Sequence, residues 1–178
     1  MSGIDKEIMK AEDIYLSDED ILRICDDKCK ILLYSDLEHF HNIDSVLAPH
    51  GAAVILYQLE QNVGHWVTII KHGSKHLELF DPYGMRIDEE LQFSQYNLRR
   101  HNGKKVPHLT HLLQTSPYKI SYNDTQLQQF KHHVNTCGAW CALRVRFRSE
   151  SLDDFIDLFT KNEHYNGDFW VKALTILV

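Results

Sequence analysis

The sequence predicts an α+β fold, with a mainly antiparallel central sheet packed against helices. Apolar, β-branched runs of strand length follow one another between residues 52 and 84. The connections between these runs are short, which is typical of antiparallel neighbours. From Cys137 onward the apolar residues recur at helical spacing instead. A group of strands followed by a group of helices indicates the α+β class.

Three consecutive strands are expected at the centre of the sheet. They read AAVILYQLE at 52–60, HWVTIIKH at 65–72 and HLELFDPYG at 76–84. A turn at 61–64 joins the first two, and Pro82 and Gly84 end the third. The run CKILLYSDL at 29–37 indicates a strand or another buried segment, and KISYN at 119–123 indicates an edge strand.

Serine residues mark the expected starts of two helices. Ser17 is followed three residues later by Asp20, and Ser151 by Asp154, which is the spacing of a capping box. A further helix is expected to begin at Cys137.

Two other segments are less specific. Residues 36–48 are expected to form a loop with a helical turn. Residues 169–178 fit either a helix or a strand.

Length and charge bound the class of protein. The chain has 178 residues, the size of one domain, and we expect a single domain over 1–178. Its net charge of -6 argues against a protein that wraps duplex nucleic acid, which would carry a basic stripe. The most basic run, LRRHNGKK at 98–105, is short and is expected to be a solvated loop. Nucleic acid is therefore not an expected partner.

The sequence also bears on the compartment. The N-terminus is charged and lacks the apolar core of a signal peptide. No stretch approaches the roughly 20 apolar residues that cross a bilayer. The cysteines, Cys25, Cys29, Cys137 and Cys141, are too few for a disulfide scaffold in a chain of this size. We therefore expect reduced thiols in the cytoplasm or nucleus, and no membrane contact.

A histidine and an aspartate stand at the ends of adjacent predicted strands. His65 begins the run HWV, and Asp81 follows the run that ends in LF. A short hairpin between two antiparallel strands brings such residues side by side. Asp81 is then expected to accept the Nδ1 hydrogen of His65, so that Nε2 faces a nucleophile.

Cys137 is the expected nucleophile. It precedes Gly138 in NTCGAWC, at the predicted start of a helix. A helix N-terminus offers a positive dipole and free N–H groups, and both favour the thiolate. Gly138 lets the backbone pass close to a substrate, and the Cys137 N–H can donate to a developing oxyanion.

A second oxyanion donor is expected from a side-chain amide upstream of Cys137. The run TQLQQFKHH contains three glutamines, at 126, 128 and 129. Gln129 and Gln128 are the candidates because they are nearest to Cys137.

Structural interpretations stand beside these catalytic ones. His65 can be a core histidine bonded to a carbonyl, and Asp81 before Pro82 can simply begin a turn. Cys141, one helical turn after Cys137, is expected to be inert. A zinc site from the cysteines, His132 and His133 was weighed, but paired cysteines in such sites more often have two intervening residues. No metal is expected.

The order His, Asp, Gln, Cys resembles that of the cysteine peptidases that include adenovirus-type proteases and proteases specific for SUMO and other ubiquitin-like proteins. The motifs GHWV, LFDPYG and TCGAWC carry this resemblance over about residues 50–150. The stretch FDPYG is similar to the viral, adenain-like branch. Gln129 lies farther from Cys137 than in that family, so a small insertion in FKHHV is assumed. The resemblance implies that Trp66 lines the substrate groove and favours small residues such as glycine near the cleaved bond.

The resemblance implies a cysteine endopeptidase or isopeptidase that works through a thioester. Its partner would be a protein substrate, either a polyprotein or a ubiquitin-like C-terminal tail. We expect a monomer without a cofactor, in the cytoplasm or nucleus of a host cell or associated with a virion. Two alternatives stay open: an acetyltransferase that uses the same His-Asp-Cys triad, and a non-catalytic binder of ubiquitin-like proteins.

Overall fold

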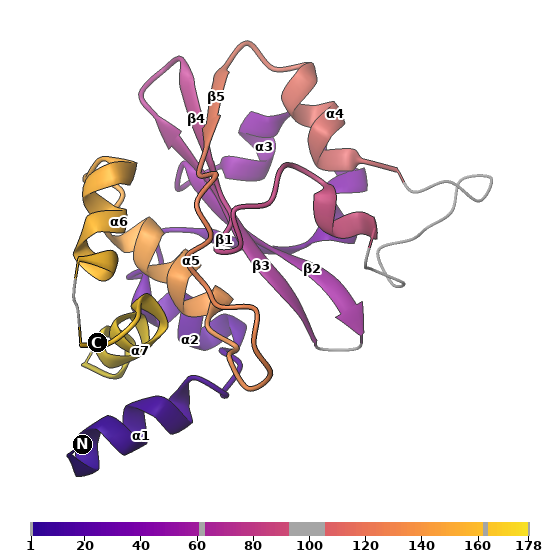
Figure 1. The fold of residues 1–178 in the computed structure, drawn as a ribbon. Coiled ribbons are helices and arrows are strands. Elements are labelled where there is room, and N and C mark those ends of the chain that lie inside the picture. Colours follow the sequence, from indigo (N-terminus) through magenta and orange to yellow (C-terminus); the bar gives the residue numbers. More distant parts are fainter. Residues whose placement is uncertain (1, 61–62, 93–105, 162–163, 178) are drawn as a thin grey trace.

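The computed structural model describes residues 2–60, 63–92, 106–161 and 164–177. A central sheet separates two groups of helices (Figure 1). The predicted turn at 61–64 is described only in part, and the basic run at 98–105 lies outside the described residues. The α+β class predicted from the sequence is confirmed, whereas the single domain and the monomeric state stay predictions.

The sheet has five strands in the order β1-β2-β3-β4-β5. Their bounds are β1 Lys30–Leu33, β2 Ala52–Glu60, β3 Val63–His72, β4 His76–Phe80 and β5 Lys119–Tyr122. The three central strands pair antiparallel, but β1 runs parallel to β2 and β5 runs parallel to β4. The expectation of a mainly antiparallel sheet is therefore corrected to a mixed one. Helical segments connect each parallel pair, and such crossovers are what parallel pairing requires.

The helices divide between the two faces of the sheet. On one face lie α2 (Asp18–Ile24), α5 (Cys137–Arg146), α6 (Leu152–Thr160) and α7 (Gly167–Leu177). On the other face lie α3 (Ile43–Leu47), α4 (His108–Gln114) and the 3-10 turn η1 (Tyr34–His39). The first helix, α1 (Gly3–Ala11), has no buried residue and packs beside α7, and η2 (Glu89–Gln92) follows β4.

The predicted caps are confirmed. Ser17 and Asp20 form a reciprocal capping box at the start of α2. The Ser151 side chain accepts from the Asp154 N–H at the start of α6. Each bond satisfies an N–H group that the first helical turn leaves without a partner. The C-terminal segment, for which helix and strand were both open, forms the helix α7.

The helix α5 is the central helix of its layer. Every residue from Cys137 to Val145 is buried, because β3 covers one side of α5 while α2 and α7 cover others. Such burial on all sides explains why α5 shows no single apolar stripe.

A buried ion pair ties α5 to the sheet. Arg144 donates from Nε and Nη2 to Glu78 in β4, at 2.6 and 2.9 Å. Its guanidinium also lies 5.2 Å from the centre of the Phe155 ring in α6. Both charged residues are buried. Two parallel bonds of this kind fix orientation as well as distance.

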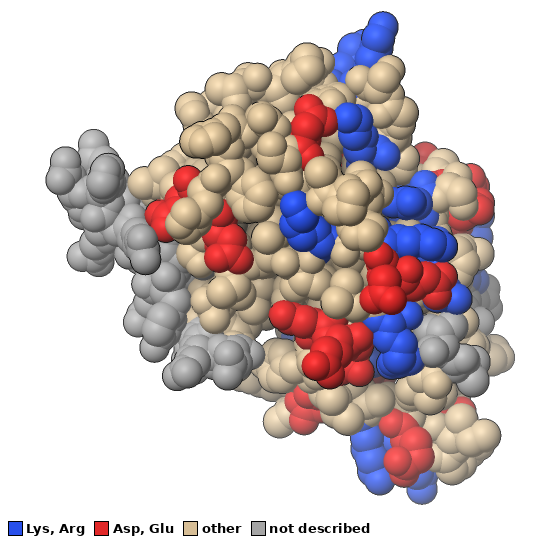
Figure 2. Space-filling view, turned by 180° about the vertical axis from the view of Figure 1, so that it is seen from behind, with Lys and Arg blue, Asp and Glu red and all other residues tan. Residues whose placement is uncertain are grey.

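The structure also bears on membrane and nucleic-acid contact. No helix among the described residues is both long and apolar enough to span a bilayer. On the face drawn in Figure 2, acidic and basic side chains lie intermingled. That nucleic acid is not a partner stays a prediction.

We predict that Arg144→Met lowers the free energy of unfolding by about 3–5 kcal/mol, because it leaves the Glu78 carboxylate buried without its main partner. Denaturant unfolding followed by circular dichroism measures this loss. The matched control is Lys161→Met, which breaks the exposed 2.5 Å pair with Asp157 and should leave stability nearly unchanged. Equal effects of the two substitutions would contradict the importance of the buried pair.

Candidate active site

His65 and Asp81 come from neighbouring strands. His65 lies in β3, and Asp81 directly follows β4, where Phe80 pairs with Thr68. Continued past the end of β4, this register puts Asp81 diagonally across from His65 on the same face. His65 Nε2 and Asp81 Oδ1 are 2.7 Å apart, and both residues are buried. The structure therefore brings this predicted pair together.

The orientation of the imidazole differs from the expected one. We expected Asp81 to accept from Nδ1 of His65, but the nitrogen at the carboxylate is Nε2. Because Asp81 lies on a diagonal rather than directly opposite, the far end of the ring is the part that reaches it. Nδ1, which is closer to the backbone, is left for the thiol.

Two sets of backbone bonds hold Asp81 in place. Gly84 N–H donates to the Asp81 carbonyl at 2.8 Å, and its φ of +70° is a conformation that favours glycine. Asn123, just after β5, accepts from the Asp81 N–H at 2.8 Å and donates to its carbonyl at 2.6 Å. The sequence analysis did not single out Asn123. Its place at the end of the predicted edge strand was the available signal.

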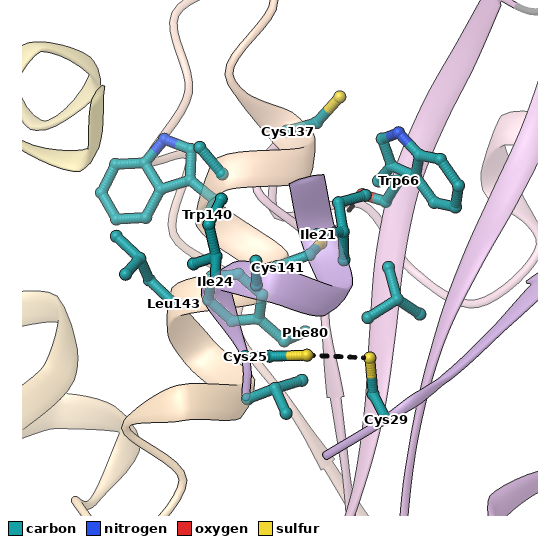
Figure 3. Close-up of a cluster of buried hydrophobic side chains, with 14 of the residues drawn as sticks. Ile21, Ile24, Cys25, Cys29, Trp66, Phe80, Cys137, Trp140, Cys141 and Leu143 are labelled. Atoms are coloured by element: carbon teal, nitrogen blue, oxygen red, sulfur yellow. Dashed lines mark hydrogen bonds between the residues drawn. The ribbon is translucent and has the colours of Figure 1, made fainter. Parts of the chain in front are cut away.

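Cys137 is the first residue of α5 and is 4% exposed. In Figure 3 its sulfur stands at the end of the helix and points away from the apolar cluster that contains Cys141. Burial raises the pKa of the Cys137 thiol, but a hydrogen bond with His65 and the charge of that ring lower it. The N–H groups of Trp66 and Gly138 lower it further, and the resulting pKa is below the ordinary value. The site therefore favours the thiolate.

A buried carboxylate holds the N-terminal end of α5. Through Oδ1, Asp168 of α7 accepts from the Thr136 hydroxyl at 2.5 Å and from Trp140 Nε1 at 2.9 Å. Its Oδ2 accepts from the Gln129 N–H at 3.0 Å. Because Thr136 bonds to Asp168, its side chain does not cap α5. The sequence analysis missed Asp168, which lies far from Cys137 along the chain and belongs to no motif.

Tyr83, within the DPYG turn, packs on the imidazole. The ring centroids of Tyr83 and His65 are 4.4 Å apart and the planes differ by 18°. Phe130 stacks on Tyr83, with centroids 4.1 Å apart. This stack restricts rotation of the His65 ring. The sequence analysis quoted Tyr83 as part of a motif without giving it a role.

The two candidate glutamines differ in placement. Gln128 is buried, and its Nε2 donates to the Tyr83 hydroxyl at 3.2 Å and to the Val134 carbonyl at 2.9 Å. The side chain of Gln129 is half-buried and has no hydrogen bond to another described residue. Of the pair, Gln128 is thus the one whose amide reaches the tyrosine that stacks on His65.

Trp66 and Gly138 touch beside the thiol. A Cβ on Gly138 would lie 3.2 Å from Trp66 Cδ1 and 3.4 Å from Leu16 Cβ, so a side chain there would crowd both. The Trp66 carbonyl accepts from Cys141 Sγ at 3.2 Å. Cys141 therefore supports the backbone of Trp66, whose N–H group lowers the pKa of the Cys137 thiol.

Two surface hollows meet at Tyr15, which lines both. One hollow contains Trp66 and the other contains Tyr83, the two aromatic neighbours of the site. The backbone before Tyr15 is held by two hydrogen bonds, at Glu12 and at Ile14. Asn135 N–H donates to the Glu12 carbonyl at 2.7 Å, and Lys172 Nζ donates to the Ile14 carbonyl at 2.8 Å.

The cysteines and histidines considered as zinc ligands do not lie together. Cys25 Sγ and Cys29 Sγ face each other at 3.2 Å inside the apolar cluster (Figure 3), while His132 and His133 are exposed. Within the described part of the chain, no group of three or more His, Cys, Asp or Glu side chains has an arrangement that could hold a metal ion.

Comparison with known proteins gives a relative of similar length. No family model matches the chain. It is 35% identical over 150 residues to the uncharacterized protein V9 of Sputnik virophage, and the match covers 84% of this chain and 86% of V9. The chain belongs to the V9 family. The V9 comparison brings no activity with it.

Among solved structures, two of the ASFV pS273R protease are similar in fold. One of them is the Se-Met form. Their TM-scores are 0.48 and 0.49 at 13% and 14% identity, covering 93% of this chain and 68% of theirs. At that distance the activity of this V9-family chain has to be inferred from its own site.

We predict that His65→Ala slows alkylation of Cys137 by iodoacetamide at neutral pH by at least about tenfold. Without the imidazole, the largest effect that opposes burial is lost and the pKa of the thiol rises, so less thiolate is present. Mass spectrometry of the Cys137 peptide gives the rate. His41→Ala, which removes an exposed histidine, is the control, and an equal rate in all three proteins would show that His65 does not activate the thiol.

Proposed function

We propose that this chain is a cysteine peptidase in which Cys137 is the nucleophile, His65 the general base and acid, and Asp81 the group that orients His65. The proposal is carried by the contact of the His65 imidazole with the Asp81 carboxylate, together with the effect of His65 on the Cys137 thiol. His65 Nε2 is 2.7 Å from Asp81, and the pKa of the Cys137 thiol is lowered by its hydrogen bond with His65. A nucleophile, a base and a group that orients the base are the parts that acyl transfer needs.

In the proposed reaction the Cys137 thiolate attacks a peptide carbonyl, whose oxygen takes up the electron pair of the double bond. The Cys137 N–H donates to that oxyanion. When the intermediate collapses, the amine leaves with a proton from the His65 imidazolium, and an acyl thioester remains. His65 then removes a proton from water, which hydrolyses the thioester and regenerates the thiolate. Of the two candidate glutamines, Gln128 is the one proposed to support the site, because its buried amide reaches Tyr83.

The substrate proposed is a protein: a polyprotein cleaved after small residues, or a ubiquitin-like C-terminal tail. The two hollows that share Tyr15 support this, because an extended chain can lie in them beside Trp66 and Tyr83, the residues that follow His65 and stack on it. The resemblance described above implies that Trp66 favours small residues beside the cleaved bond. A virophage relative supports action in a host cell or virion.

We predict that the wild-type protein forms a covalent adduct with a Gly-Gly vinyl sulfone peptide or a ubiquitin-family vinyl sulfone, and that Cys137→Ala forms none. The same substitution should abolish cleavage of virophage structural proteins on co-expression, read as new N-termini by mass spectrometry. The reason is that no other described cysteine contacts an imidazole held by a carboxylate.

Cys141→Ser is the matched control for that experiment. It changes a thiol one helical turn away and keeps a donor for the Trp66 carbonyl, so it should retain adduct formation. Cleavage that persists in Cys137→Ala would refute the peptidase assignment. Labelled acetyl transferred from acetyl-CoA to Cys137 would indicate the acetyltransferase instead, and binding without any adduct would indicate a non-catalytic binder.

A further inference from the structure

The Tyr83 hydroxyl has a free hydrogen at a position where the proposed reaction needs a donor. Tyr83 is stacked between His65 and Phe130, with centroid distances of 4.4 and 4.1 Å, so its ring is held on both faces. Its hydroxyl oxygen is 3.2 Å from Gln128 Nε2. The ring thus places an O–H group next to the catalytic imidazole in a fixed orientation.

The direction of the bond between Gln128 and Tyr83 follows from a third group. The Val134 carbonyl lies 2.9 Å from the same Gln128 nitrogen. A carbonyl only accepts hydrogen bonds, so the Gln128 atom beside it must be the NH2 group rather than the amide oxygen. The Tyr83 oxygen therefore accepts from Gln128. The Tyr83 hydrogen has no acceptor among the described residues, although the hydroxyl is within the site.

The surroundings keep that hydrogen in place. Burial raises the pKa of Tyr83 to about 12, and the charges of Cys137, Asp168 and Asp81 add to the effect. At neutral pH the hydroxyl is consequently a neutral donor.

We propose that the Tyr83 hydroxyl is the second oxyanion donor, acting with the Cys137 N–H, and that Gln128 is a positioning residue that holds this hydroxyl. The inference rests on the proposed peptidase function. As the thiolate attacks, the carbonyl oxygen gains the electron pair and accepts from both donors. As the intermediate collapses, the pair returns to the carbonyl and the amine leaves with a proton from His65. Tyr83 neither gains nor loses a proton.

This assignment also explains the spacing of the glutamine. Both hydrogens of the Gln128 amide are already directed to Tyr83 and Val134. Gln128 therefore acts on the site through the Tyr83 hydroxyl that it holds. Because Tyr83 lies between Gln128 and the proposed oxyanion, a glutamine closer to Cys137 is not needed.

The test is Tyr83→Phe, which keeps both ring stacks and removes only the hydroxyl. With a fluorogenic peptide amide ending in Gly-Gly, we expect kcat to fall by about 100-fold or more while KM stays unchanged. Alkylation of Cys137 by iodoacetamide should proceed at the wild-type rate, because alkylation forms no oxyanion. A merely structural role for the hydroxyl would not separate these two rates.

Two further variants complete the design. Tyr122→Phe removes a hydroxyl from a partly exposed tyrosine at the sheet edge and should keep full activity. In Gln128→Leu kcat should fall, and the double variant with Tyr83→Phe should be little worse than Tyr83→Phe alone, since both act through one hydroxyl. If Tyr83→Phe leaves kcat unchanged, or lowers kcat and the alkylation rate equally, the role of the Tyr83 hydroxyl is refuted while the peptidase function stands. A wild type that hydrolyses nothing, and forms no vinyl sulfone adduct, overturns the peptidase function with it.

Discussion

The 2.7 Å contact between His65 Nε2 and Asp81 Oδ1 is the interaction on which the rest of the site depends. It decides which nitrogen of the ring is left for the Cys137 sulfur. Because both residues are buried, solvent competes little with the contact. The DPYG turn and Asn123 hold the Asp81 backbone, the Tyr83 N–H donates to its carboxylate, and the Tyr83 ring holds the imidazole. The thiolate is then stabilised by a group that is already oriented.

Cys137, the proposed nucleophile, is positioned by the packing of α5 as much as by its own hydrogen bonds. Arg144 fastens the later part of the helix to β4, and Asp168 fastens the residue before its first turn to α7. Cys141 bonds to the carbonyl of Trp66, whose N–H group lowers the pKa of the Cys137 thiol. The site thus combines a helix end and a strand held against each other, a rigid arrangement of the kind that catalytic groups require.

Local patterns were enough to predict several parts of this structure. The caps at Ser17 and Ser151, the central strands and the meeting of His65 with Asp81 depend on short spacings that the sequence displays directly. The parallel pairing of the edge strands could not be predicted from the sequence. The pairing of β1 with β2 and of β5 with β4 depends on long crossover connections, and no short sequence pattern encodes their paths. The flipped imidazole follows from a diagonal register, which only coordinates reveal.

Other parts of the site depend on contacts between distant segments. Asp168 belongs to α7 and has no motif of its own, so its bonds to Thr136 and Trp140 had no signal in the sequence. Gln128 and Gln129 differ in burial, and the sequence of two adjacent glutamines does not predict which one is buried. Tyr83 was visible in the DPYG motif, but its stacking on His65 appears only when the turn is folded.

The most direct measurement of the central claim is the pH titration of thiolate ultraviolet absorbance, taken as wild type minus Cys137→Ala. The subtraction removes the other cysteines, including Cys25, whose pKa a hydrogen bond with Cys29 lowers to about 7. If the imidazole held by Asp81 stabilises the sulfur anion, the difference titrates below the ordinary thiol pKa of 9.0. A difference that titrates at or above that value would contradict the account.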